Sequence, residues 1–195
     1  AGGVKETECD LRQAVREIYD FLHPQAQEKN LAFHLDCTGL THPHIYADGE
    51  KLRQMLTYLV NNAVTYTKSG GSVTITVSQE ETNNRTGVYH LTVEDTGVGI
   101  SPEFLDRIFE PFTRERNSTL SGIHGIGLGL TIAKSIVDMM GGTIQIKSAV
   151  GKGTVFTTTF HFRLQPRPTA FRKSLPIKET AQRILLAEDN EINRE

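Results

Sequence analysis

The chain has 195 residues, of which 37% are hydrophobic and 23% are charged, so it can bury one ordinary globular core and still carry an extra segment. Its formal net charge of −2 argues against nucleic acid as a partner, because no basic field is present to attract phosphates. Cys9 and Cys37 fit neither a disulfide framework nor a zinc spacing, and no apolar run is long enough to predict a membrane span.

The first third of the chain alternates between helical and strand patterns. Asp10 can cap a helix whose apolar residues recur at helical spacing, and Pro24 predicts a kink or a break in that helix. Alternating apolar and polar residues predict short strands at 31–36 and 44–47. A second helix, capped by Asp48, has one apolar face made of Leu52, Met55, Leu56, Leu59, Val60 and Ala63.

The central part of the chain predicts two strands, a short helix and a segment without periodicity. The strands are predicted at 72–79 and 88–94, joined by a polar turn. Ser101-Pro102-Glu103 predicts the start of a helix that ends near Phe109, because proline is favoured at the first helical position. From 114 to 124 the chain is polar and aperiodic, which favours a mobile lid.

The last part of the chain changes character after residue 164. A helix is predicted at 128–140, closed by Gly141-Gly142, and a hairpin follows at 143–148 and 154–162. The proline-containing stretch 165–182 is typical of a linker, and 183–187 has the pattern of a buried strand. We therefore divide the chain into a domain at 1–164, a linker at 165–182 and the truncated start of a further domain at 183–195.

Two glycine-containing motifs predict a nucleotide site. Asp95-Thr96-Gly97-Val98-Gly99 places beside two glycines a carboxylate that can accept a hydrogen bond from an exocyclic amine such as that of adenine. The motif Gly125-Ile126-Gly127-Leu128-Gly129-Leu130 opens a helix. Its glycines let main-chain N–H groups approach phosphates, and the helix start adds free N–H donors and the positive end of its dipole.

Four motifs, in this order, resemble those of the catalytic ATP-binding domain of bacterial sensor histidine kinases over roughly residues 10–162. They are Leu59-Val60-Asn61-Asn62-Ala63, the Asp95 motif, Ile108-Phe109-Glu110-Pro111-Phe112 and the Gly125 motif. The resemblance implies an α+β fold of the GHKL type, a two-layer sandwich with helices on one face of a mixed, mostly antiparallel sheet. It also implies a protein-histidine kinase module that binds Mg-ATP and donates the γ-phosphoryl group to a histidine.

The tail Ile184-Leu185-Leu186-Ala187-Glu188-Asp189-Asn190 resembles the first strand of a receiver domain, as in a hybrid histidine kinase. The implied partners are this receiver and the dimerisation helices with the phosphoacceptor histidine, which we expect before Val4 of a homodimeric parent. This piece should then show little activity alone. We expect a cytoplasmic location, with no nucleic acid and no direct membrane contact, and the parent can be anchored in the inner membrane.

The resemblance assigns roles to individual residues. Asp95 would bind the adenine amine, and Thr154 would reach the adenine through water, although Thr154 also fits a plain strand position. Asn62 would be the Mg²⁺ ligand and would act in catalysis with Arg114, a lid arginine that either contacts the γ-phosphate or is solvated. The other nucleotide-binding residues that it implies are Gly97, Gly99, Phe112, Gly125, Gly127, Leu128 and Gly129.

Two residues depart from the family pattern. Tyr58 stands one turn before Asn62, where asparagine is frequent, and Thr65 stands where a lysine or arginine is common. Losing a charged phosphate contact could weaken binding by about 1.5–3 kcal/mol. A degenerate module with weak nucleotide binding, acting as a regulatory protein-interaction domain, is therefore the alternative. A gyrase-like hydrolase ranks lower, because Tyr58 cannot activate water as a glutamate would.

Overall fold

The computed structural model of the chain describes residues 3–81, 83–111 and 128–167. The chain divides into two units, Ala1–Gln165 and Pro166–Glu195, and the described helices and strands belong to the first unit. The helices are α1 (Leu11–Glu28), α2 (Gly49–Tyr66), α3 (Pro102–Leu105) and α4 (Gly129–Met139). The strands are β1 (Thr7–Asp10), β2 (Ala32–Gly39), β3 (His44–Ala47), β4 (Ser72–Glu81), β5 (Thr86–Asp95), β6 (Thr143–Ala149) and β7 (Gly153–Leu164).

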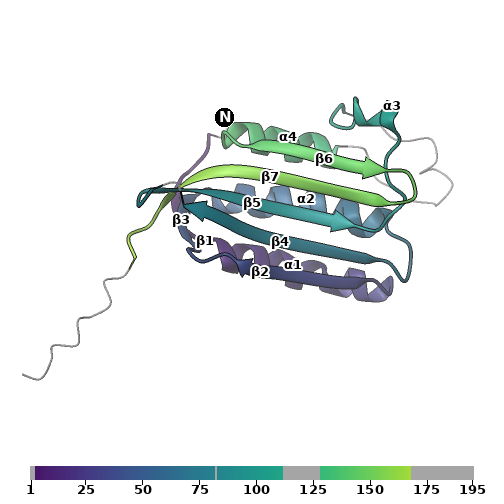
Figure 1. Ribbon diagram of the computed structural model, residues 1–195, viewed down its shortest axis with the longest axis horizontal. Coiled ribbons are helices and arrows are strands. Elements are labelled where there is room, and N and C mark those ends of the chain that lie inside the picture. Colours follow the sequence, from purple (N-terminus) through teal and green to yellow (C-terminus); the bar gives the residue numbers. More distant parts are fainter. Residues whose placement is uncertain (1–2, 82, 112–127, 168–195) are drawn as a thin grey trace, which may run out of the picture. The chain divides into compact units, whose positions relative to one another are not determined.

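The strands form one mixed sheet in the order β1-β3-β7-β5-β4-β2, and β6 also pairs with β7. Among the described strands, every pair is antiparallel except β2 with β4. Helices α1, α2 and α4 lie on one face of the sheet, as Figure 1 shows. This is the two-layer α+β sandwich with a mostly antiparallel sheet that the family resemblance implied.

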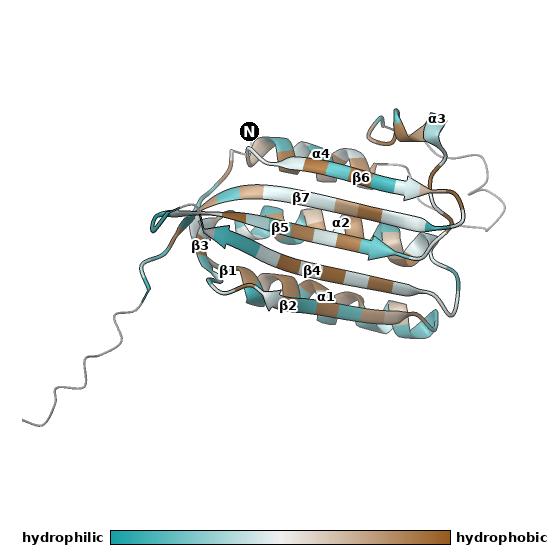
Figure 2. Ribbon diagram, in the orientation of Figure 1, coloured by the Kyte–Doolittle hydropathy of each residue, from teal (hydrophilic) through white to brown (hydrophobic). Residues whose placement is uncertain are grey.

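Alternation along the strands turns apolar side chains toward the helices. On β5, Tyr89, Leu91 and Val93 are fully buried, whereas Thr92 is only half-buried on the opposite face. Figure 2 shows the same alternation of apolar and polar residues along β4 and β5. A shift of one residue in pairing would expose the whole apolar set, and each buried side chain is worth about 1.5–3 kcal/mol. Burial therefore fixes the register that positions the strand ends.

Helix α1 begins after Asp10 as predicted and continues through Pro24, where the sequence predicted a kink or a break. The Asp10 carboxylate accepts a main-chain N–H group from the first turn at 3.1 Å, as a capping residue should. The helix runs through Pro24 to Glu28, so the chain does not break at the proline. Proline removes one intrahelical hydrogen bond, but Ala26 beyond it is fully buried and holds the last turn on the core. Asn30, with φ of 58°, then ends the helical path.

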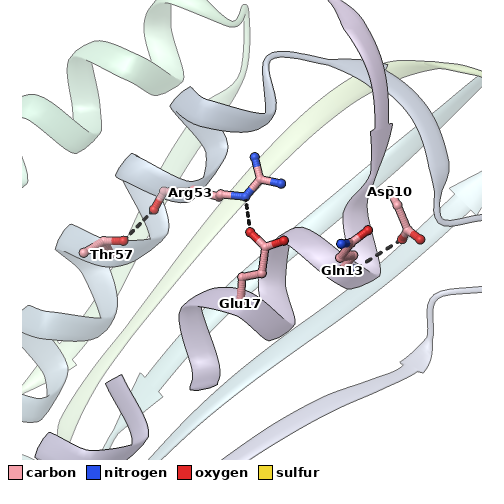
Figure 3. A network of polar contacts seen from close by, with 5 residues as sticks. All are labelled: Asp10, Gln13, Glu17, Arg53 and Thr57. Carbon is pink, nitrogen blue, oxygen red and sulfur yellow. Dashed lines mark hydrogen bonds and ion pairs between the residues drawn. The ribbon is translucent and has the colours of Figure 1, made fainter. Parts of the chain in front are cut away.

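Helix α2 lies beside α1, and polar side chains join the two (Figure 3). Asp48 caps α2 by accepting the N–H of Lys51 at 3.2 Å, as the sequence predicted. Arg53 Nε donates to Glu17 Oε2 at 2.6 Å across the two helices. This ion pair is exposed to solvent, so it contributes at most about 1 kcal/mol. The apolar face of α2 therefore supplies most of the stabilisation.

Helix α3 is shorter than predicted, because it ends at Leu105 and turns continue to Glu110. Phe104 from this helix is buried together with Ile100 and Ile108 in a small second apolar cluster. This cluster, more than the helix itself, fixes the chain near Phe109. No helix in the described ranges combines the length and hydropathy needed to cross a membrane.

Candidate functional site

The predicted base-binding and phosphate-binding residues that the structure describes lie around one end of the sheet. Asp95 ends β5 and pairs with Val73 at the start of β4 and with Thr154 at the start of β7. The loop after β5 is joined to the C-terminal end of α2, since Val98 donates its N–H to the carbonyl of Tyr66 at 3.2 Å. Two strand starts, a strand end and a helix end therefore surround the Asp95 carboxylate.

The Asp95 side chain is held by one of its two oxygens. Oδ1 accepts the main-chain N–H of Gly97 at 2.8 Å and that of Thr154 at 3.2 Å. The residue is only 5% exposed. Within the described ranges Oδ2 has no hydrogen-bond partner, so the side chain presents one oriented acceptor for a donor such as an amine.

Burial raises the pKa of the Asp95 carboxyl above its ordinary value, and the two N–H donors only partly offset this effect. The nearby charge of Glu94 raises the pKa slightly further. An ionised carboxylate in a desolvated position is costly for the empty protein, and a charged acceptor forms stronger hydrogen bonds than a neutral one. The arrangement therefore favours a ligand that brings a donor to Oδ2.

Close packing around Asp95 requires glycine at specific positions. A Cβ on Gly97 would lie 2.6 Å from the carbonyl oxygen of Tyr66 and 2.8 Å from Oδ1 of Asp95. Gly99 and Gly153 have φ of +72° and +89°, and a Cβ on either would lie 2.0 Å from a backbone oxygen. At 97 and 99 the glycines thus serve the packing of the loop against α2 and the β6–β7 turn, whatever they also do for a ligand.

Thr154 belongs to a hydroxyl network that the sequence analysis missed. Its Oγ1 lies 2.8 Å from Ser148 Oγ, which also donates to the carbonyl of Gly153 at 2.9 Å and accepts the N–H of Ile100 at 2.8 Å. Ser148 thereby ties β6 to the start of β7 and to the loop after β5. The only sequence signal for it was its place opposite Thr154 in the predicted hairpin.

The C-terminal end of α2 is held by a lysine from outside the helix. Lys29 Nζ donates to the carbonyls of Val64 and Thr65 at 2.8 and 2.7 Å, and burial lowers its pKa from the ordinary value. These carbonyls have no intrahelical partners at a helix end, so the ammonium group satisfies both. The backbone carbonyl of Thr65 thus binds a cation, the ammonium group of Lys29.

Asn62 lies on α2 four residues after Tyr58 and is half-buried. Residues at this spacing share one face of a helix, so Asn62 and Tyr58 lie on the same side of α2. The Tyr58 ring reaches the start of α4, where a Cβ on Gly129 would lie 3.1 Å from Tyr58 Cδ1. Asn62 therefore lies one helical turn beyond Tyr58, on the side of α2 that contacts the helix start predicted for phosphates.

Leu128 and Gly129 form that helix start. Leu128 is the N-cap residue, and its carbonyl accepts the first intrahelical hydrogen bond, from Ile132 at 2.9 Å. The N–H groups before Ile132 lack intrahelical acceptors, which is the usual property of an anion-binding helix end. Thr131 Oγ1 donates to the carbonyl of Phe109 at 2.9 Å, so the first turn of α4 is joined to the predicted phenylalanine motif.

Four predicted site residues lie outside the described ranges: Phe112, Arg114, Gly125 and Gly127. Their assignments stay predictions. Among the described residues no group of three or more His, Cys, Asp or Glu side chains could hold a metal ion. Of the described residues, Asn62 is the one that the sequence predicted as a Mg²⁺ ligand, through its amide oxygen.

Known proteins match this chain over most of its length. The family model for histidine kinase-, DNA gyrase B- and HSP90-like ATPases matches residues 47–165. The autoinducer 2 sensor kinase/phosphatase LuxQ of Vibrio parahaemolyticus is 32% identical over 95% of the chain and 22% of LuxQ. The aerobic respiration control sensor protein ArcB of Escherichia coli K12 is 37% identical over 94% of the chain and 23% of ArcB.

A solved structure agrees with these relatives. Full-length ShkA, crystallised in complex with AMPPNP, superposes with a TM-score of 0.72 at 28% identity, over 86% of this chain and 33% of ShkA. The chain thus spans about a fifth of the length of LuxQ and ArcB. The matched residues 47–165 include α2, the loop after β5, α4 and the β6–β7 hairpin, and with them every described residue of the predicted site. The chain therefore belongs to the family of histidine kinase-, DNA gyrase B- and HSP90-like ATPases.

Proposed function

We propose that this chain is the ATP-binding catalytic module of a hybrid sensor histidine kinase. It would bind Mg-ATP and donate the γ-phosphoryl group to a histidine on dimerisation helices of the same protein. The observation that carries the proposal is the Asp95 carboxylate, fixed by two main-chain N–H groups on Oδ1 and open on Oδ2. The sensor kinases among the relatives and the AMPPNP complex of ShkA support the same interpretation.

At the base end, Asp95 Oδ2 would accept the exocyclic amine of adenine. Thr154 would assist through water, since its hydroxyl is oriented by Ser148. Gly97 and Gly99 would let the loop after β5 lie close to the base. An amine donor satisfies Oδ2, whereas a carbonyl oxygen at the same position of another purine would repel it, so the site should prefer adenine.

At the phosphate end, the N–H groups at Leu128 and Gly129 would face the phosphates, and Asn62 would supply an oxygen to Mg²⁺. When bound, the ion would neutralise phosphate charge and orient the terminal phosphoryl group. Gly125 and Gly127 would extend the same contact, Phe112 would help to anchor the lid, and Arg114 would stabilise the charge that develops on the γ-phosphate.

The chain's own contribution to catalysis would be positioning. Holding the terminal phosphoryl group in line with the acceptor histidine lowers the barrier with little covalent chemistry by protein groups. The acceptor would lie on the dimerisation helices of a homodimeric parent, and the phosphoryl group would pass on to a receiver domain. The alignments with LuxQ and ArcB cover 94–95% of the chain and so continue past Gln165. The receiver start at 183–195 rests on the resemblance of 184–190 to the first strand of a receiver domain.

A degenerate, regulatory module is the second candidate, and one observation favours it. Tyr58 packs a ring against Gly129, and Thr65 has its carbonyl bound by Lys29, at two positions where polar phosphate contacts are frequent in the family. Such a module would bind nucleotide weakly and act by contacting partner proteins.

Calorimetric titration of the full chain with Mg-ATP measures whether it binds the nucleotide. Incubation of a longer protein that includes the predicted helices with radiolabelled ATP then measures histidine phosphorylation. Binding followed by labelling supports the kinase. Binding without labelling supports the regulatory module, and no binding up to millimolar nucleotide rejects both the site and the function. Appreciable autophosphorylation by these 195 residues alone would contradict the domain assignment.

A further inference from the structure

Tyr58 on α2 packs against the apolar core and against the start of α4. It is half-buried and packs against the main apolar core, one helical turn before Asn62. Its ring also faces the first residue of α4. A Cβ on Gly129 would lie 3.1, 3.7 and 3.8 Å from Cδ1, Cγ and Cβ of Tyr58. One side of the aromatic side chain therefore sets how closely α4 can approach α2.

This contact explains a glycine that the backbone alone does not require. Gly129 is absent from the residues with positive φ in the described chain, so another residue could adopt its conformation. Glycine inside a helix end is also less favourable than alanine. Among the described residues, the three heavy atoms nearest to a Cβ at 129 all belong to Tyr58, and the nearest of them, Cδ1, is a ring atom.

The opposite side of the same helical turn has its own attachment. Thr131 Oγ1 donates to the carbonyl of Phe109 at 2.9 Å, and Leu130 packs against the small cluster of Ile100, Phe104 and Ile108. The first turn of α4 is thus held between an aromatic ring on α2 and a hydrogen bond to the segment after α3. Two attachments on different elements restrict both the position and the direction of its free N–H groups.

We propose that Tyr58 is a positioning residue for nucleotide binding: its ring fixes the first turn of α4 so that the N–H groups of that turn face the phosphate tail. The inference rests on the proposed function, because it concerns the phosphate end of the same site. In this chain the packed ring would align these N–H groups by preorganisation, without a contact of its own to the phosphates. The effect should then depend on the ring and not on its hydroxyl group.

The test compares ligands with and without phosphates. Dissociation constants of the full chain for Mg-ATP and for adenosine are measured with Tyr58, Tyr58→Phe and Tyr58→Ala. Tyr58→Phe should match the unmodified chain within about twofold for both ligands. Tyr58→Ala should weaken Mg-ATP by about tenfold and leave adenosine within about twofold, because only the phosphate end loses its alignment. Tyr19→Ala is the matched control, since Tyr19 is also half-buried on a helix but lies on α1, hydrogen-bonded to Phe33.

A double-mutant cycle tests the contact itself. Gly129→Ala should weaken Mg-ATP binding by about tenfold beside Tyr58, and by about threefold or less in the Tyr58→Ala background, where the added methyl group has room. Equal losses of Mg-ATP affinity from Gly129→Ala in both backgrounds overturn the proposal. It is also overturned if Tyr58→Phe binds Mg-ATP as weakly as Tyr58→Ala, or if Tyr58→Ala weakens Mg-ATP and adenosine equally. If the unmodified chain binds adenosine but not Mg-ATP, the phosphate end and this proposal both fail. If it binds Mg-ATP and Tyr58→Ala binds it equally well, only the role of Tyr58 fails.

Discussion

Replacing Asp95 by asparagine tests the base-binding end of the site with almost no change of shape. Oδ1 accepts the N–H groups of Gly97 and Thr154 at 2.8 and 3.2 Å, so an asparagine must keep its oxygen there. The reverse orientation would place an NH₂ group against two donors. The NH₂ group is therefore forced to the position of Oδ2, where it would meet the exocyclic amine of adenine as a second donor.

The size of the effect follows from the hydrogen bond that is lost. A hydrogen bond to a charged group contributes about 1.5–3 kcal/mol, so Asp95→Asn should weaken Mg-ATP binding by about 10- to 150-fold. Inosine triphosphate carries a carbonyl oxygen in place of the amine, and that oxygen can accept from the new NH₂ group. The preference for ATP over inosine triphosphate should therefore narrow by at least about tenfold.

The same substitution should not weaken the fold. Burial raises the pKa of Asp95, so the folded chain binds more protons than the unfolded chain in the interval between the ordinary and the raised value. Stability due to this group is therefore highest below the ordinary carboxyl pKa and falls as pH rises through that interval. Asparagine does not titrate, so at neutral pH Asp95→Asn should be at least as stable as the unmodified chain, and the difference should shrink or reverse on acidification.

The assays are calorimetric titration with each nucleotide and urea unfolding at several pH values. Glu94→Gln is the matched control, because Glu94 is the exposed preceding residue on β5, and its binding should stay within about twofold. Unchanged ATP affinity in Asp95→Asn would refute the role given to Oδ2. A loss of affinity that parallels a loss of stability would mean that the substitution acts through folding and not through the base.

Three further substitutions test the frame around the site by urea unfolding. Gly153→Ala should lower the free energy of unfolding by more than about 1 kcal/mol beyond the effect of Gly151→Ala. Both glycines have positive φ, but only a Cβ at 153 meets the backbone, 2.0 Å from the carbonyl oxygen of Asp95. Equal losses of stability would show that this close approach has no effect. Lys29→Met should cost about 1–3 kcal/mol, since two carbonyls at the end of α2 lose their donor, and a neutral result would show that water replaces the ammonium group. Asp10→Ala should cost about 1 kcal/mol by removing the cap of α1 while leaving nucleotide affinity unchanged; a change in affinity would contradict the separation of cap and site.

Much of the fold was predictable because local and tertiary preferences agree. Strands β4, β5 and β7 show a period of two along their length, and both long helices begin at aspartates whose side chains cap them. Strand β1 was missed, since its four residues are mostly exposed and carry no apolar alternation. It exists because each residue pairs with β3, which is information held by a partner distant in sequence. The helix also continues through Pro24 without a break, because burial of Ala26 on the core outweighs the local preference of proline.

The candidate site was also predictable only in part. The sequence motifs predicted roles for Asp95, Asn62, Thr154 and the start of α4 from the chemistry of carboxylates, amides and glycines at those spacings, and these roles stay predictions. Motifs could not show which oxygen of Asp95 is occupied, since that depends on a backbone turn and a neighbouring strand. Ser148 was equally invisible, because only the pairing of β6 with β7 brings it to Thr154.

The hydrogen bond between Thr131 and Phe109 has an evolutionary consequence. It fixes the departure and the return of the intervening chain at neighbouring points of the framework, so the framework does not depend on how many residues connect them. Insertions and deletions between Arg114 and Gly125 would therefore leave both fixed ends and the predicted phosphate-binding residues in place.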